Sequence, residues 1–256
     1  MVQLLINILI IVFLYVVPLI VFIKYSTEIN LGITLLIVIG LVYGLLVLFT
    51  SKFTYNLMPF VLVIACLVYF RKIHNQQKQL KLQNGEIEGD SPNYSDYAIY
   101  GFTLKEFSIL RAIKFTVLIY IASICVESLF FMLFNYLKLN LSQQEVVQYM
   151  TNLPINQFII FIPVSVIFAP VVEEFVFRYI LFEKILNKRI PSILSSIISS
   201  LIFALIHFNL RAFPILVSIG LANCYLIHKK GFWYSVFNHS MFNLVTIMAL
   251  LIDKVP

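Results

Sequence analysis

Long apolar runs dominate the sequence and constrain its fold more than any other feature. Eight of them approach the length of about 20 residues that a helix needs to cross the hydrocarbon core of a bilayer. They lie near residues 4–23, 31–50, 55–70, 115–137, 155–182, 191–209, 212–228 and 232–252. Only 12% of the residues are charged, against about 25% in a soluble domain. The sequence therefore predicts an all-α fold, a polytopic membrane helix bundle with about eight transmembrane helices.

One long polar segment, residues 71–114, divides the chain. We expect residues 1–114 to form N-terminal transmembrane helices with a cytoplasmic loop, and residues 115–256 to form the membrane core. With eight spans, thirteen Lys and Arg side chains lie in connections on the side of the polar segment and four on the other side. Such a bias marks the cytoplasmic side. The net charge of +6 therefore reflects topology, and we expect membrane lipid rather than nucleic acid as a partner.

Polar side chains inside the apolar runs are concentrated in the C-terminal half of the chain. Six of them lie in three different runs: Glu173, Glu174 and Arg178 in the fifth, His207 in the sixth, and His239 and Asn243 in the eighth. A charge within a span costs about 2.5–3.5 kcal/mol on insertion scales, so such a group usually faces a cavity and serves a function. These residues therefore indicate a site inside the membrane, within residues 173–243.

Helical geometry relates five of these side chains. Glu174 and Arg178 are four residues apart and share a face, where they can form an ion pair. Glu173 is turned about 100° from Glu174 by the 3.6-residue period and so faces a different neighbour. His239 and Asn243 are also four residues apart, and together they can donate two hydrogen bonds to one oxygen atom.

The set is typical of a hydrolytic site. A carboxylate in an apolar pocket is a better base near neutral pH than one in water, so Glu173 with His207 could hold and deprotonate a water molecule. His239 and Asn243 could stabilise the oxyanion that forms when this water attacks a peptide carbonyl. Counting about 1.5 Å per residue from the cytoplasmic helix ends puts Glu173 about 15 Å deep, His239 about 12 Å and His207 about 24 Å.

Three motifs in successive membrane segments carry a resemblance to a known family. Glu-Glu-x-x-x-Arg, Phe-x-x-x-His and His-x-x-x-Asn, in this order, resemble the CAAX-protease and bacteriocin-processing family of intramembrane endopeptidases over residues 155–250. The resemblance implies an all-helical membrane fold around a conical cavity. It implies that four residues are catalytic: Glu173, His207, His239 and Asn243. Glu174 and Arg178 would support them.

The requirement for a metal is open at this point. Glu173, His207 and His239 could ligate Zn²⁺, which usually takes three protein ligands and a water in catalytic sites. No His-Glu-x-x-His motif is present. The family is described both as metal-dependent and as using a glutamate without metal. We expect that no cofactor is required, with zinc as the alternative.

The resemblance implies an intramembrane endopeptidase that acts on a membrane-associated peptide or protein. A compact chain rich in Ile, Phe, Tyr and Asn is typical of bacteria, so we expect a multi-pass protein of the bacterial plasma membrane. Bacterial members of the family are linked to processing of peptide pheromones or leaders and to self-immunity against bacteriocins. The alternative is a non-catalytic membrane scaffold or immunity protein of the same fold. The oligomeric state is left open.

Two further polar residues lie inside apolar runs. Glu127 could line the same cavity, could offer Arg178 a second partner, or could be a protonated or locally hydrogen-bonded carboxyl. Asn223 is expected to bond across helices rather than to bind substrate.

Overall fold

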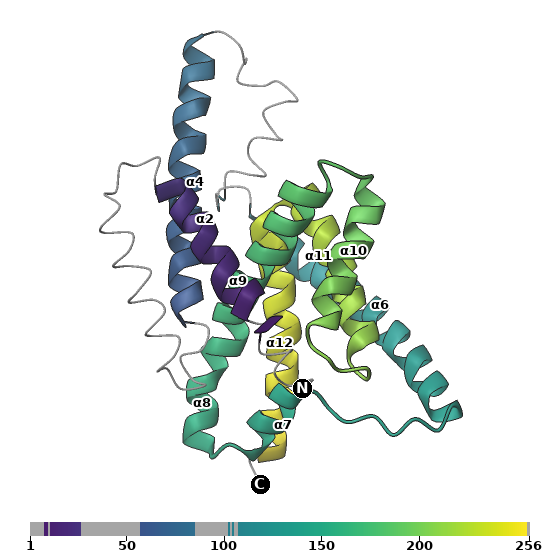
Figure 1. Ribbon diagram of the computed structural model, residues 1–256. Helices are drawn as coiled ribbons and strands as arrows, with labels where there is room; N and C mark the ends of the chain where they lie inside the picture. The colour runs from purple at the N-terminus through teal and green to yellow at the C-terminus, as the bar shows by residue number, and fades with distance from the viewer. Residues whose placement is uncertain are drawn as a thin grey trace.

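The structure is a computed structural model that describes residues 8–9, 11–26, 57–84, 102, 104 and 107–254. Over these residues it consists of helices and their connections, with no strand (Figure 1). The elements in chain order are η1 (Ile11–Val16), α2 (Val17–Ser26), α4 (Leu57–Gln83), α6 (Ile109–Tyr136), α7 (Glu145–Asn152), α8 (Ile155–Pro163), η4 (Val164–Phe168), α9 (Ala169–Glu173), η5 (Glu174–Leu186), α10 (Ser192–Leu205), α11 (Phe213–Lys230) and α12 (Phe232–Lys254). The apolar run expected at 31–50 lies outside the described residues. The all-α class is confirmed for the part described.

Among the described residues, three helices are long and apolar enough to cross a membrane: Ile109–Tyr136, Ile155–Leu186 and Phe232–Lys254. Shorter apolar helices accompany them, at Ile11–Lys24 and Ser192–Leu205. The second of these, α10, has 14 residues, or about 21 Å at 1.5 Å per residue, and so falls short of a hydrocarbon core of about 30 Å. The chain is thus a helical integral membrane protein, while the count of eight spans stays a prediction.

The helix Ile155–Leu186 contains two prolines and is not a uniform α-helix. It passes from α8 through the π-helical turns of η4 into α9, and η5 is π-helical again. Pro163 and Pro170 lack the N–H that would bond to the preceding turn, and each ring crowds the carbonyl four residues earlier. Wider π turns between them relieve this crowding, and such turns are frequent at functional sites. Glu173 ends α9 and Glu174 begins η5.

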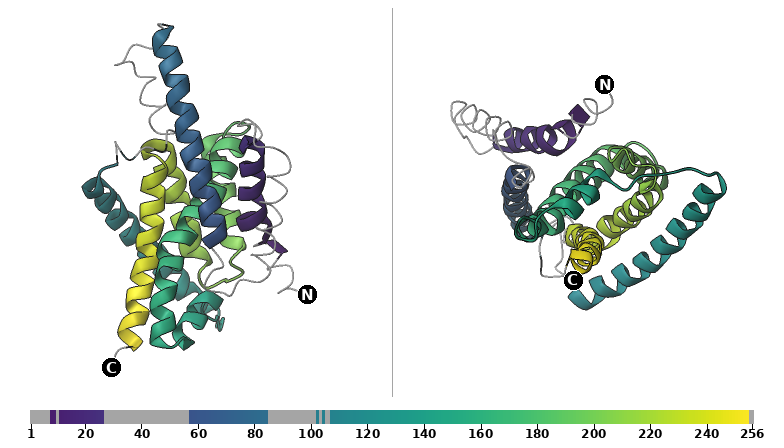
Figure 2. Two further views of the ribbon diagram at one scale, coloured as in Figure 1. Left: turned by 90° about the vertical axis from the view of Figure 1, so that its left-hand side faces the viewer. Right: turned by 90° about the horizontal axis from the view of Figure 1, so that it is seen from below.

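The centre of the bundle is formed by η5, α10, α11 and α12 (Figures 1 and 2). Phe177, Phe203 and Cys224 are fully buried between these helices. The helices α10 and α11 make the most extensive contact, because Ser200 packs directly against the backbone at Gly220. By contrast, α6 lies on the outside against α11 and α12, and most of its surface is exposed (Figure 2).

The cation-rich ends of the helices lie on one side of the bundle. The C-terminal ends of α4, η5 and α11 are at the top of Figure 1, whereas the α10–α11 connection and the end of α12 are on the opposite side. This arrangement agrees with the expected grouping of Lys184, Lys188 and Arg189 with Lys229 and Lys230. Which side faces the cytoplasm stays a prediction from the Lys and Arg bias.

We expect Gly220→Ala to destabilise the bundle, because the new Cβ would lie 2.7 Å from Ser200 Cβ. Overpacking of this kind typically costs about 1–3 kcal/mol. The measurement is the melting temperature of the detergent-solubilised protein. Gly220→Ala/Ser200→Gly is the matched control, since it removes the two side-chain atoms, at 2.7 and 2.9 Å, that the methyl group would meet. A double variant no more stable than the single one would contradict this description of the contact.

Candidate active site

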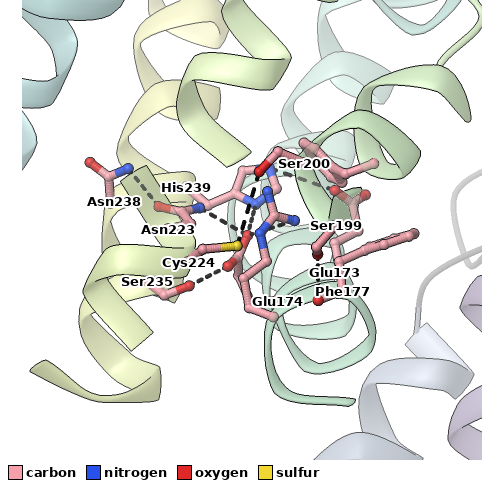
Figure 3. A network of polar contacts seen from close by, with 12 residues as sticks. Glu173, Glu174, Phe177, Ser199, Ser200, Asn223, Cys224, Ser235, Asn238 and His239 are labelled. Atoms are coloured by element: carbon pink, nitrogen blue, oxygen red, sulfur yellow. Dashed lines mark hydrogen bonds and ion pairs between the residues drawn. The ribbon is translucent and has the colours of Figure 1, made fainter. Parts of the chain in front are cut away.

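Glu174 lies at the centre of the site and has no exposed surface (Figure 3). Its Oε1 accepts hydrogen bonds from Asn223 Nδ2 at 2.9 Å and from His239 Nδ1 at 2.7 Å. Ser235 donates a hydrogen bond to Oε2. Arg178 Nη1 lies 3.4 Å from Oε1. A buried carboxylate is tolerated only with such compensation, and Glu174 therefore ties α11 and α12 to η5.

Arg178 compensates this charge from within the same helix. The predicted ion pair with Glu174 is confirmed, and neither side chain is exposed. The guanidinium carbon of Arg178 lies 4.0 Å from the centroid of the Phe203 ring. None of its nitrogens has a hydrogen-bond partner among the described residues. The ion pair and the cation–π contact, which contributes about 2 kcal/mol or more when desolvated, therefore stabilise the buried guanidinium.

His239 joins the two adjacent glutamates. Its Nδ1 bonds to Glu174, and its Nε2 lies 3.6 Å from Glu173 Oε2. Because Glu174 is a carboxylate that only accepts, Nδ1 carries the proton of that bond. In a neutral imidazole Nε2 would then direct a lone pair at the carboxylate of Glu173, which is repulsive. A proton shared between Nε2 and the Glu173 carboxylate would remove this repulsion.

Glu173 is the more accessible of the two carboxylates. Its side chain is 14% exposed, whereas that of Glu174 is fully buried. Glu174 is occupied by partners on three helices, but the contact with His239 is the single ion pair that Glu173 makes with a described residue. Of the two neighbours, Glu173 is therefore the one that a water molecule can approach.

His207 lies in the turn that follows α10. Its Nδ1 donates a hydrogen bond to the carbonyl oxygen of Phe203 at 2.8 Å, which leaves Nε2 with a lone pair in the neutral ring. Glu173 lies near enough for its carboxylate to act electrostatically on this ring. The ring of Phe203 makes edge-on contacts with the rings of His207 and His239, at 4.9 and 5.7 Å between centroids. Phe203 therefore positions both imidazoles as well as the guanidinium.

Asn243 lies one turn beyond His239 on α12, as its spacing predicted. Its Nδ2 donates to the carbonyl oxygen of Ser165, at 2.8 Å, in the π-helical segment η4. The two donors that we expected to converge on one oxygen thus have different partners, since His239 Nε2 faces Glu173. Their joint role as an oxyanion site stays a prediction, and it needs Asn243 to exchange the Ser165 carbonyl for a substrate oxygen.

Polar residues outside the three motifs extend the network. Asn238 Nδ2 donates to Asn223 Oδ1 at 2.8 Å, and Asn223 in turn donates to Glu174 (Figure 3). The expectation that Asn223 bonds across helices is confirmed. Ser235 and Asn238 were not predicted. A signal existed for Ser235, which lies four residues before His239 and so shares its face of α12.

Glu127 does not join this cluster. Within the described part of the chain, the ion pair of Arg178 is with Glu174 alone. Glu127 instead lines a crevice that Arg211 also lines. The interpretation of Glu127 as a second partner of Arg178 is therefore wrong.

The residues expected to bind zinc, if a metal is used, are Glu173, His207 and His239. Across residues 107–254 and the shorter described segments, no three His, Cys, Asp or Glu side chains are grouped so as to hold a metal ion. Both ring nitrogens of His239 face carboxylates, and Nδ1 of His207 is bonded to Phe203. Nε2 of His207, Nε2 of His239 and the carboxylate of Glu173 are the groups that a zinc ion would use, and the expectation that no cofactor is required stays a prediction.

Comparison with protein families finds one similarity for this region. Residues 155–245 match the model of the family described as type II CAAX prenyl endopeptidase Rce1-like. This part of the chain is similar to that family, and residues 155–245 are called the Rce1-like region below. The match includes all six predicted site residues and the helices that carry them, so the resemblance expected from the three motifs is confirmed. No curated protein and no solved structure matches the chain.

We expect Arg178→Met to destabilise the Rce1-like region, because it leaves the Glu174 carboxylate buried without its cation. Breaking a buried pair in this way costs about 3–5 kcal/mol. The measurement is the melting temperature in detergent, with the abundance of membrane-inserted protein beside it. Glu174→Gln/Arg178→Met should recover part of the loss, because no unpaired charge remains buried. Additive losses in this double-mutant cycle would show that the two side chains do not interact.

Proposed function

We propose that the protein is an intramembrane endopeptidase that hydrolyses peptide bonds of a membrane-associated peptide or protein. One observation carries this proposal: His239 joins the accessible carboxylate of Glu173 to the fully buried carboxylate of Glu174 inside a region that matches a peptidase family. The first carboxylate is placed to act as a base, and the second holds the histidine in one orientation.

Glu173 and His207 activate the water in this proposal. Glu173 is ionised when the shared proton resides on His239 Nε2, and its carboxylate then takes a proton from water as the water oxygen attacks the peptide carbonyl carbon. The lone pair on His207 Nε2 helps to hold that water. Glu173 afterwards gives the proton to the leaving amine nitrogen as the C–N bond breaks, so that protons balance over the cycle.

His239 and Asn243 stabilise the oxyanion. A protonated Nε2 on His239 is a charge-assisted donor, and such donors are stronger than neutral ones. Loss of one donor of this kind commonly lowers kcat by about 10²–10³. Glu174 and Arg178 contribute indirectly, because they fix the imidazole plane before substrate arrives.

The substrate class follows from the location of the site. Five of the six site residues lie on helices long and apolar enough to cross the membrane, so a scissile bond must reach them within or beside the bilayer, in an extended segment whose peptide groups are accessible. The family name refers to prenyl endopeptidases, but the composition indicates a bacterial plasma membrane protein. Processing of a peptide pheromone or leader, or self-immunity against a bacteriocin, is the role we propose.

A second function has one observation in its favour. Both expected oxyanion donors are engaged with protein acceptors, Glu173 and the Ser165 carbonyl, as in a polar network that only stabilises a fold. A non-catalytic scaffold or immunity protein would be consistent with this. The two functions differ in what they require of Glu173, since a scaffold needs no base.

We expect Glu173→Gln to abolish peptide cleavage, with a loss of at least about 10²-fold because the general base is removed. The measurement is mass spectrometry of new peptide termini in membranes from cells that express each variant. Glu183→Gln is the matched control, since Glu183 is also buried on η5 but bonds to His228, away from the site. Termini identical to those of the unaltered protein would refute the peptidase and favour the scaffold.

We expect cleavage to persist after metal is removed with EDTA or 1,10-phenanthroline, because the proposed reaction uses side chains and water alone. The rate of the purified protein in detergent, before and after chelation, is the measurement. A loss that added Zn²⁺ restores would overturn the metal-free mechanism while leaving the peptidase assignment intact.

A further inference from the structure

A second polar feature lies at the outer face of the bundle, apart from the Glu174 network. A crevice of about 320 Å³ separates the C-terminal half of α6 from the α10–α11 connection. Most of its wall is one stretch of α6, and Arg211 faces it from the connection. The lining residues are Glu127, Ser128, Phe131, Met132, Phe134 and Arg211. The crevice therefore combines an apolar floor with one carboxylate and one guanidinium.

The two charges of the crevice need compensation that the described residues do not supply. Neither Glu127 nor Arg211 makes an ion pair or hydrogen bond with a described residue. Glu127 lies nine residues before the end of α6, about 13 Å along the helix axis, in a helix otherwise apolar enough to span the membrane. An ionisable group there marks a functional site, because burying it without a partner costs several kcal/mol.

The surroundings of the crevice indicate what fills it. The face of α6 around it is exposed and apolar, with Leu129, Phe130 and Leu133 open to the exterior. In a membrane this exterior is lipid, which is the solvent and is present at far higher concentration than any peptide. Since α6 runs obliquely to α12 (Figure 1), the depth of Glu127 in the membrane is smaller than its distance of about 13 Å from the end of α6 along the helix axis. A lipid headgroup can therefore reach it.

We propose that the crevice binds the headgroup of a phospholipid that carries both a primary ammonium and a phosphate, such as phosphatidylethanolamine. The ammonium donates hydrogen bonds to the Glu127 carboxylate, and the Arg211 guanidinium binds the phosphate, for which its planar fork is suited. An acyl chain covers Phe131 and Met132. One carboxylate and one guanidinium in a single crevice complement a zwitterion, whereas an anionic lipid would leave Glu127 unpaired. This proposal does not depend on the peptidase function.

The test measures lipid binding to the delipidated, detergent-solubilised full chain by native mass spectrometry. Phosphatidylethanolamine, phosphatidylglycerol and phosphatidylcholine are titrated separately. We expect one phosphatidylethanolamine to bind about tenfold more tightly than either of the others, because phosphatidylglycerol lacks the cation and phosphatidylcholine lacks ammonium N–H donors. Glu127→Gln should remove this preference, and Arg211→Gln should weaken binding of all three lipids.

Two matched controls remove exposed charges of the same signs. Glu145→Gln removes a negative charge in α7, and Lys138→Gln removes a positive charge in the connection that follows α6. Both should bind phosphatidylethanolamine as the unaltered chain does. Equal affinity of the unaltered chain for the three lipids would overturn the proposal, even if a crevice variant failed to fold. A Glu127→Gln variant that keeps the preference would also overturn it, since the carboxyl would then be a protonated group without a role in binding.

Discussion

The carboxylate of Glu174 has no contact with solvent, and the arrangement of the Rce1-like region depends on how its charge is compensated. Arg178 supplies a cation from the next turn of η5, while Asn223 donates from α11, and Ser235 and His239 donate from α12. Lipid between helices provides no hydrophobic force for their association, so packing and interhelical hydrogen bonds must do so. One anion that accepts from two other helices fixes their rotation and depth. It thereby fixes His239, and through His239 the side chain of Glu173.

Those parts of the site that depend on spacing within one helix could be predicted from the sequence. Glu174 and Arg178 were expected to pair because they are four residues apart, and the pair forms even though η5 is π-helical. Glu173 was expected to face a different neighbour from Glu174, but both carboxylates contact His239, each through a different ring nitrogen. Asn223 was expected to bond across helices because an amide in an apolar run has few other ways to be satisfied. Such arguments need the helical period and the cost of a buried polar group, and both are local.

Contacts between helices could not be predicted, because they depend on how the helices pack. Nothing in the spacing of Phe203 shows that its ring lies under Arg178 and beside two imidazoles. The partner of Asn243 is the backbone carbonyl of Ser165, and every residue type has such a carbonyl, so the sequence cannot indicate this contact.

Helix boundaries were a further source of error. The expected depths placed His207 about 9 Å below Glu173 at 1.5 Å per residue, but the helix that carries Glu173 continues to Leu186 and α10 ends at Leu205. Glu173 is thus further from that helix end than the estimate assumed, which brings the two residues closer in depth.

Three carboxylates, those of Glu174, Glu127 and Glu173, show how a structural acid can be told from one that faces a ligand. Glu174 is fully buried, and every oxygen is matched by a donor from the protein. Replacing its partners changes the fold before it changes any chemistry. Glu127 is half-buried in a crevice and is matched by no donor among the described residues. Its charge must be satisfied by something outside the described residues, or the group must be protonated. Glu173 lies between these cases, because it has one protein partner and is 14% exposed, and a base that must release and accept a proton requires this intermediate state. A carboxylate held like Glu174 cannot exchange protons without breaking the bundle, and one as open as Glu127 has no fixed histidine to share a proton with.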